Sequence, residues 1–366
     1  MEKSNNHQEK KTQEFNRRNF LKFAGGTMAA MTAIPLFSQL TAQAQESGQK
    51  QVTWSGSHAV SQYDPSKPIV YFTRDLSPEG VQKIYEKINQ GITSKVGIKL
   101  HTGELHGPNL LPIEYIKNLQ SKIPRSTIVE CNVLYNSPRR ETKTHRETIK
   151  INGFDFCPVD IMDADGDVML PIPGMKEFLN KELDKFGVNC PFTPGGHLQE
   201  IAMGKHVLNY DSLLVYTHFK GHAMGGFGGS LKNIGIGMAS GKVGKRMIHE
   251  EGWPVGKGFL ERMVESGKAT VEHFKGHIAY INVLKNISID CDCDVHGVKP
   301  TCDDIGIIGS TDILAADQAS IDMIYQLPAS QRRDIVERIE SRSGLHQLEY
   351  MEKMGMGSRQ YNLIEI

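Results

Sequence analysis

The sequence has no net charge, since its 366 residues include 42 basic and 42 acidic ones. A chain without a basic excess lacks the attraction that nucleic acids and anionic membranes exert on their protein partners. Neither is therefore expected as a main partner. After the first 44 residues the sequence also has no internal repeat and no low-complexity block. The remaining length allows one large or two medium domains.

A long uninterrupted hydrophobic run is also missing. Residues 23–40 are moderately apolar, but Gly25, Gly26 and Pro35 interrupt them, so they do not predict a transmembrane helix. The pair Arg17-Arg18 precedes this stretch, and Ala42-Gln43-Ala44 follows it as a small-x-small cleavage site. We therefore expect residues 1–44 to be a twin-arginine signal peptide that exports the folded protein to the periplasm.

The leader contains six of the basic and three of the acidic residues, so the mature chain has 36 and 39. No cysteine lies near the cleavage site, which argues against a lipid anchor, and no membrane span is expected in the mature chain. Proteins exported by the twin-arginine route fold before they cross the membrane, and many carry a cofactor. The leader therefore favours a bound metal or cofactor.

The classical nucleotide-binding motifs are absent: neither Gly-x4-Gly-Lys-Ser/Thr nor a complete dinucleotide fingerprint occurs. Instead, residues 218–242 contain eight glycines, three lysines, two histidines and no acidic residue. Backbone amides freed by glycine can surround an anion. A close crossing of two chain segments would require glycine equally well. Both interpretations stay open at this point.

The order of predicted elements indicates an α/β fold. Strands are expected at residues 69–72, 96–100 and 126–134, with helices at 78–90 and 112–122 between them. This alternation predicts a mainly parallel sheet flanked by helices, in a single large or two-lobed domain. Ligands collect at the carboxyl ends of such strands, so Lys99 and His101 are expected to face a site.

The domain is expected to occupy residues 69–327, after a polar lead-in at 45–68. Thr311 is expected to cap a helix that reaches about residue 327, and Asp317 within it is expected to pair locally. Residues 328–366 should form a charged helix, at 330–354, and an irregular tail.

Two pairs of side chains have the chemistry of metal ligands. His218 and His222 are four residues apart, and Cys291 and Cys293 are two apart. Imidazole and thiolate suit zinc or iron. The alternatives are hydrogen-bonded structural histidines, and disulfides in an oxidising compartment. The spacing of Cys291, Cys293 and Cys302 matches neither a zinc ribbon nor a bacterial ferredoxin.

These stretches together resemble the iron–sulfur-centre proteins grouped as domain of unknown function 362. The matching residues are 99–104 (Lys-Leu-His-Thr-Gly-Glu), 218–222 (His-Phe-Lys-Gly-His), 226–233 (Gly-Phe-Gly-Gly-Ser-Leu-Lys-Asn), 241–242 (Gly-Lys), 291–293 (Cys-Asp-Cys), 304–306 (Asp-Ile-Gly), Ser310, Asp312 and Asp317. Many members of that family look like carriers of a ferredoxin insert with two iron–sulfur clusters. At the corresponding place, residues 243–276, this chain has no cysteine. The resemblance implies a variant without the insert, and Cys302 falls outside the family pattern.

The first hypothesis is therefore an exported metal-binding protein of zinc or iron–sulfur type. It is expected to be redox-related, with a redox partner protein, and to bind or act on a small anionic ligand. The expected metal ligands are His218, His222, Cys291 and Cys293. The expected ligand-binding residues are Lys99, His101, Gly226, Gly228, Gly229, Lys232, Asn233 and Lys242.

Two other hypotheses remain. One is a non-catalytic periplasmic protein that binds a small anion and has disulfide-bonded cysteines. The other is group transfer on a phosphorylated ligand at the glycine-rich stretch. The sequence identifies neither a substrate nor a catalytic residue.

Overall fold

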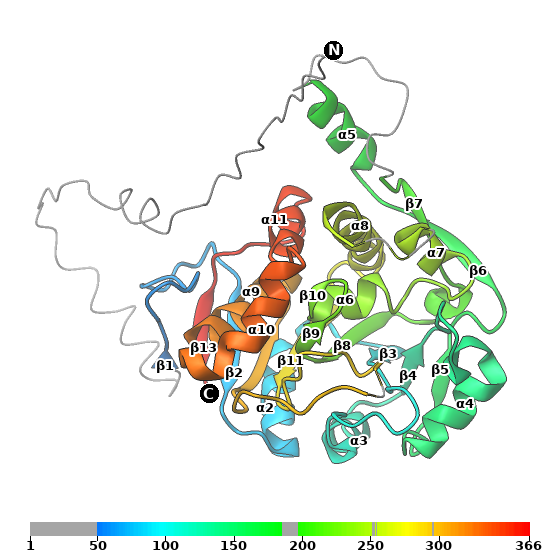
Figure 1. Cartoon of the computed structure of the whole chain (residues 1–366), viewed down its shortest axis with the longest axis horizontal. Coiled ribbons are helices and arrows are strands. Elements are labelled where there is room, and N and C mark those ends of the chain that lie inside the picture. Colours follow the sequence, from blue (N-terminus) through cyan, green and yellow to red (C-terminus); the bar gives the residue numbers. More distant parts are fainter. Residues whose placement is uncertain (1–49, 185–196, 251–252, 254, 295) are drawn as a thin grey trace, which may run out of the picture. The chain divides into compact units, whose positions relative to one another are not determined.

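A nine-stranded sheet forms the centre of the protein (Figure 1). The computed structural model describes residues 50–184, 197–250, 253, 255–294 and 296–366, so the predicted signal peptide lies outside the described residues. In sheet order the strands are β1 (Lys50–Gln51), β13 (Asn362–Glu365), β2 (Ile69–Thr73), β12 (Gly306–Ser310), β11 (Ile278–Leu284), β8 (Ser212–His218), β3 (Val96–Lys99), β4 (Ser126–Glu130) and β5 (Val159–Ile161).

Most neighbouring strands run parallel. β11, β8, β3, β4 and β5 form a continuous parallel block, and β13 is parallel to β2. β12 is antiparallel to both of its neighbours, and β1 is antiparallel to β13. The predicted fold class, an α/β fold with a mainly parallel sheet, is confirmed.

Helices cover both faces of the sheet, which explains why its central strands read as continuous apolar runs. In β8, Leu213 and Val215 belong to one hydrophobic cluster, while Leu214 and Tyr216 belong to the other. One face is covered by α2 (Pro78–Ile88), α3 (Ile113–Ser121) and α4 (Thr142–Ile151). The other face is covered by α6 (Ser230–Gly235), α7 (Gly244–His249), α8 (Lys257–His273), α9 (Ile313–Gln326), α10 (Ala329–Ser341) and α11 (His346–Lys353).

Two small antiparallel pairs lie outside the main sheet. β9 (Lys220–His222) and β10 (Gly226–Gly228) form a hairpin directly after β8. β6 (Asp167–Pro171) and β7 (Glu200–Gly204) form the second pair, and α5 (Met175–Asp184) lies between them in the chain. The first hairpin positions the site, because it connects β8 to α6.

Several predicted element boundaries are confirmed. α2 begins at Pro78, and the Ser77 side chain accepts a hydrogen bond from the Gly80 amide as its cap. The cap of α9 differs from the prediction, because Asp312 rather than Thr311 accepts from Ala315 (2.8 Å). Asp312 is one residue closer to the helix and has a carboxylate that reaches the first-turn amide.

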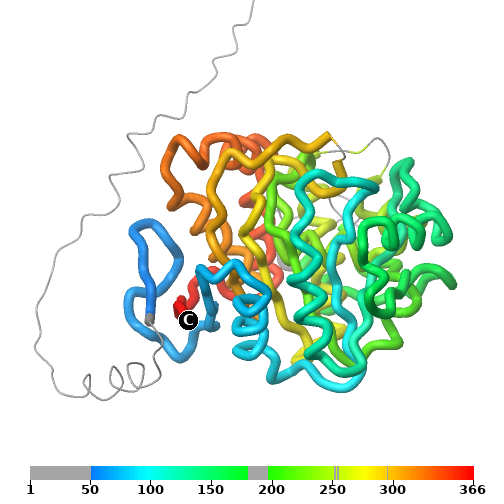
Figure 2. Tube along the Cα trace, turned by 90° about the horizontal axis from the view of Figure 1, so that it is seen from below, coloured from blue at the N-terminus to red at the C-terminus, as the bar shows by residue number. Residues whose placement is uncertain are grey.

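The C-terminal residues differ most from the sequence-based prediction. The helix expected at residues 330–354 is two helices, α10 and α11, because Ser343 adopts a left-handed conformation (φ 54°) between them. The tail is not irregular, since residues 362–365 form β13 inside the main sheet. Figure 2 shows this C-terminal strand beside the first part of the described chain, where β1 and β2 pair with it. The lead-in and the tail therefore stabilise each other.

No helix in the described part of the chain is long and apolar enough to cross a membrane.

Candidate metal and anion site

The site lies where three parallel strands end at the same edge of the sheet. Lys99 is the last residue of β3, Glu130 is the last of β4, and His218 is the last of β8. The carboxyl ends of adjacent parallel strands bring such residues together in space. This edge is the position that the sequence predicted for Lys99 and His101.

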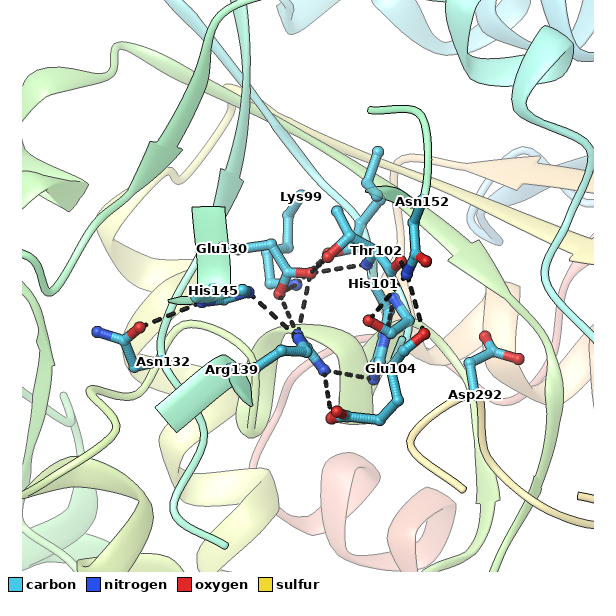
Figure 3. A network of polar contacts seen from close by, with 12 residues as sticks. Lys99, His101, Thr102, Glu104, Glu130, Asn132, Arg139, His145, Asn152 and Asp292 are labelled. Carbon is cyan, nitrogen blue, oxygen red and sulfur yellow. Dashed lines mark hydrogen bonds and ion pairs between the residues drawn. The ribbon is translucent and has the colours of Figure 1, made fainter. Parts of the chain in front are cut away.

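Glu130 anchors a buried network of charges (Figure 3). Its Oε1 accepts hydrogen bonds from the Thr102 amide (2.7 Å), the Thr102 hydroxyl (2.8 Å) and Arg139 Nη2 (3.2 Å). Lys99 Nζ lies 3.5 Å from Oε2. Burial opposes ionisation of Glu130, but Lys99 and Arg139 outweigh it and hold the pKa of the carboxyl well below its usual value. The carboxylate therefore stays charged and fixes both cations.

The Arg139 guanidinium contacts two carboxylates and one histidine ring. Its Nη1 lies 3.3 Å from Glu104 Oε1, and its Nε donates to His145 Nε2 (3.2 Å). Burial and the Arg139 charge lower the pKa of His145 to about 3, so His145 is a neutral acceptor at ordinary pH. The guanidinium is buried and lines the cavity described below.

Lys99 connects this network to α6. Its ammonium donates to the Leu100 carbonyl (2.6 Å) and to Asn233 Oδ1 (3.0 Å). The Asn233 amide in turn donates to the Tyr216 carbonyl and the Thr217 hydroxyl, both at 3.0 Å. Burial lowers the pKa of Lys99 to about 8, even though Glu130 raises it. Lys99 and Asn233 are thus placed together, as expected.

His222, Cys291 and Cys293 form the one metal-compatible cluster among the described residues. One donor atom from each lies within 4.8 Å of the donor atoms of the other two. Lys232 Nζ lies 3.6 Å from Cys291 Sγ. The Nδ1 atom of His222 accepts hydrogen bonds from the Met224 (3.3 Å) and Gly225 (2.9 Å) amides, which leaves Nε2 as the free ring nitrogen.

His218 does not join this cluster. Its Nδ1 lies 2.9 Å from Asp292 Oδ2, and its Nε2 lies 2.8 Å from the Lys285 carbonyl oxygen, so both ring nitrogens are engaged. Asp292 also binds Lys220 Nζ (2.6 Å). Burial opposes ionisation of Asp292, but His218 and Lys220 hold its pKa far below the usual value. His218 therefore positions the loop that contains both cysteines and is left out of the ligand set.

The described cysteines form no disulfide: Cys131, Cys157, Cys291, Cys293 and Cys302 are free thiols. Cys190 lies outside the described residues. Cys302 donates to the Ile287 carbonyl (3.6 Å) and is absent from the metal-compatible cluster. The structure therefore separates the Cys291–Cys293 pair from the other described thiols.

A cavity of about 330 Å³ adjoins the cluster. It brings together six of the predicted site residues: Lys99, His101, His222, Lys232, Asn233 and Cys293. Cationic side chains outnumber carboxylates in its lining. The cations are Lys99, Arg139, Lys232 and Lys245, and the carboxylates are Glu130 and Asp294.

The glycine-rich stretch does not form the expected anion cradle. The amides of Ser230 (2.7 Å) and Leu231 (2.9 Å) donate to the carboxylate of Asp317, which occupies the start of α6. A Cβ atom on Gly229 would lie 2.5 Å from Asp317 Oδ1. Gly226 and Gly228 form β10 and are not among the residues lining the cavity. These glycines permit close packing, which was the other interpretation of the sequence.

Lys242 also lies outside the cavity lining. Its side chain is 76% exposed, lies 3.6 Å from Glu141 and lines a separate groove. Its placement differs from the expectation, because it lies on the loop between α6 and α7 and pairs there with Glu141.

The cavity residues that were not found from the sequence include Glu130, Arg139, Lys245 and His249. Lys245 Nζ donates to the Ala239 carbonyl (2.5 Å). His249 is 6% exposed, and its Nδ1 has no hydrogen-bond partner in the described structure. Burial and then Lys245 lower the pKa of His249 to about 3, so its ring is neutral. Glu130 lies inside the strand predicted at 126–134, and it reaches the site because β4 ends at this residue.

Comparison of the sequence with known protein families shows the family to which the chain belongs. The chain belongs to the family described as Domain of unknown function (DUF362), whose model matches residues 96–322. That range covers the parallel block of the sheet, the cavity and both cysteines. No curated protein matches the chain.

Two solved structures are similar in fold. The lactate racemase apoprotein from Thermoanaerobacterium thermosaccharolyticum has 11% identity and a TM-score of 0.41, over 73% of this chain and 60% of that chain. A protein from Thermotoga maritima has 12% identity and a TM-score of 0.36, over 73% of this chain and 58% of that chain. This chain thus matches about three fifths of the length of each.

Proposed function

We propose that the protein binds one transition-metal ion through Cys291, Cys293 and His222, beside a cavity that takes a small anion. The observation that supports this most is the mutual proximity of the three donor atoms, all within 4.8 Å. Two of the three donors come from the loop after β11 and one from the β9–β10 hairpin, so the fold brings together segments about 70 residues apart in the chain.

The donor set suits a single zinc or iron ion. Two thiolates and one imidazole are ligands that both metals accept, and three protein ligands leave a coordination position open for a ligand or water. An iron–sulfur cluster is commonly held by four thiolates. The described residues bring only two sulfurs together, so we favour a mononuclear ion.

The charge of the cavity supports an anionic ligand. Lys232 and Lys245 each have one hydrogen-bond acceptor among the described residues, which leaves donor capacity for a ligand. A volume of about 330 Å³ suits a small organic acid. A carboxylate close to both ammonium groups would gain charge-assisted hydrogen bonds in a site of low dielectric.

Metal analysis of protein purified after export from its host tests this proposal. We expect about one zinc or iron ion per chain, and loss of that ion in the Cys291→Ser, Cys293→Ser double variant. Cys302→Ser is the matched control, since its thiol lies outside the cluster. Metal content that is unchanged in the double variant would contradict the proposal.

A metal-free anion-binding protein is the second candidate, and one observation favours it. Because two backbone amides donate to Nδ1 of His222, the neutral ring has its proton on Nε2. In that form neither ring nitrogen has a free lone pair, so His222 does not coordinate a metal. Metal-free protein that still binds a carboxylate with full affinity would support this second function.

We further propose export by the twin-arginine route, followed by function in the periplasm with a redox partner protein. The pair Arg17-Arg18 supports the route, and a soft-donor metal site supports the redox role. Replacing both arginines by lysine should leave the protein in the cytoplasmic fraction. Unchanged periplasmic recovery of this variant would contradict the route.

A further inference from the structure

We propose that the ligand of the cavity has a second anionic group, a phosphate, that binds in the neighbouring groove between Arg140 and Arg246. This inference depends on the proposed function in one respect, because it assumes that the cavity takes the first anionic group. It adds a second subsite and therefore a substrate class, namely small phosphorylated acids.

The groove and the cavity share part of their lining. It has a volume of about 450 Å³ and is lined by Val133, Leu134, Arg140, Glu141, Gly241, Lys242 and Arg246. Val133 and Leu134 also line the cavity. The two spaces are therefore neighbours, and the proposed ligand passes Val133 and Leu134 between them.

Two short helical segments present consecutive cations to the two spaces. In the 3-10 helix Pro138–Arg140, Arg139 lines the cavity and Arg140 lines the groove. In α7, Lys245 lines the cavity and Arg246 lines the groove. The inner cation of each pair is buried and has protein partners, whereas the outer one faces the open groove. This repeated arrangement matches a molecule with one anionic group on each side of the boundary.

The outer arginines are available for a ligand. In the described part of the chain, neither the Arg140 nor the Arg246 side chain has an ion pair or hydrogen bond. The one acid that lines the groove, Glu141, lies 3.6 Å from Lys242, and both side chains are largely exposed. The groove therefore has three cations and one carboxylate on a chain without net charge.

The chemistry of these cations favours phosphate over a second carboxylate. A guanidinium presents parallel N–H donors that match two phosphate oxygens, and a phosphate has three oxygens to share between two arginines. The groove is also fixed in place, since the Gly241 amide donates to Asp163 Oδ2 (2.8 Å). A preformed subsite loses less entropy when it binds.

Binding of synthetic phosphonocarboxylates tests the inference by calorimetry. These probes have a carboxylate and a phosphonate joined by one to five methylene groups, so they sample the distance between the subsites. We expect the probe with one particular linker length to bind at least about tenfold more tightly than a simple carboxylate or a simple phosphonate of the same length. A gain of that size is typical of one charged hydrogen-bonded contact. The Arg140→Gln, Arg246→Gln double variant should lose this gain and keep its affinity for the simple carboxylate.

Arg333→Gln is the matched control, because Arg333 is an 80% exposed arginine on α10. If no linker length exceeds the monofunctional acids, or if the double variant keeps the gain, the second subsite does not exist. Binding of the simple carboxylate in that case leaves the proposed function intact. If neither simple nor bifunctional acids bind, the second subsite and the anion-binding part of the proposed function both fail, and metal analysis tests the metal site separately.

Discussion

Lys232 Nζ lies 3.6 Å from Cys291 Sγ, at the boundary between the thiol pair and the cavity. A hydrogen bond from Cys293 lowers the pKa of Cys291 well below its usual value; burial opposes this shift, and Lys232 reinforces it. Cys291 in turn raises the pKa of Lys232 against the effect of burial. The ammonium and the thiolate therefore stabilise each other's charges.

Replacing Lys232 by methionine should remove this stabilisation. In metal-free protein we expect the apparent pKa of the thiol pair to rise by about 1 to 3 units, the range typical of losing a close opposite charge. Thiolate absorbance or the rate of alkylation as a function of pH measures this shift. A titration curve that coincides with that of the unmodified protein would show that Lys232 does not act on the thiols.

Affinity for an anion should depend on the protonation of Lys99. Because burial lowers the pKa of Lys99 to about 8, its positive charge is present at neutral pH and is lost as the pH rises through that value. A bound anion shifts this loss to higher pH. We therefore expect carboxylate affinity to be level near pH 7 and to fall above about pH 8, in calorimetric titrations from pH 7 to 9.5.

Burial also lowers the pKa of Lys245, so this second lysine is the necessary control. The fall in affinity should persist in Lys245→Met and disappear in Lys99→Met. The reverse outcome would assign the effect to Lys245.

Removing the charge of Asp292 should destabilise the fold. Its carboxylate binds both His218 and Lys220 in a buried position, so Asp292→Asn leaves buried groups without their partner. Such changes cost about 3 to 5 kcal/mol of unfolding free energy. Glu365→Gln is the control, because Glu365 pairs with an exposed Arg74 and should cost less than about 1 kcal/mol. Urea titrations that give equal losses for the two variants would rule out a structural role for the Asp292 pair.

Two glycine substitutions should change the free energy of unfolding in opposite directions. Gly229→Ala places a Cβ atom 2.5 Å from Asp317 Oδ1, and we expect a loss of about 1 to 3 kcal/mol in unfolding free energy. Gly258→Ala, in the first turn of α8, meets only the end of the Arg262 side chain at 3.5 Å, so a gain of about 0.5 to 1 kcal/mol is expected. Thermal unfolding of both variants measures the difference. A neutral Gly229→Ala would show that the α6 start is not closely packed.

Much of the fold could be predicted from local sequence signals. Ser77 and Pro78 define the start of α2, and the apolar runs at 69–72 and 96–100 correspond to β2 and β3. The C-terminal strand β13 could not be found in this way. Its pairing with β2 joins residues nearly 300 positions apart, and nothing in residues 362–365 alone indicates that contact.

The candidate site could be predicted only in part. Lys99, His101, Lys232 and Asn233 were found because strand ends and a family-like motif mark them. His218 was grouped with His222 because the two lie four residues apart, in a glycine-rich stretch that resembles a family motif. Here the chain passes from β8 to β9 between them, so the two rings separate. Arg139 and His249 escaped notice because their burial depends on long-range packing.

Cobalt substitution of the purified protein tests the central claim most directly. Intense thiolate-to-cobalt charge-transfer bands, with an X-ray absorption spectrum that requires two sulfur neighbours and one or more nitrogen neighbours, are the expected result for ligation by Cys291, Cys293 and His222. A bound ion surrounded only by nitrogen and oxygen, or no bound ion in protein with all thiols reduced, would contradict the account.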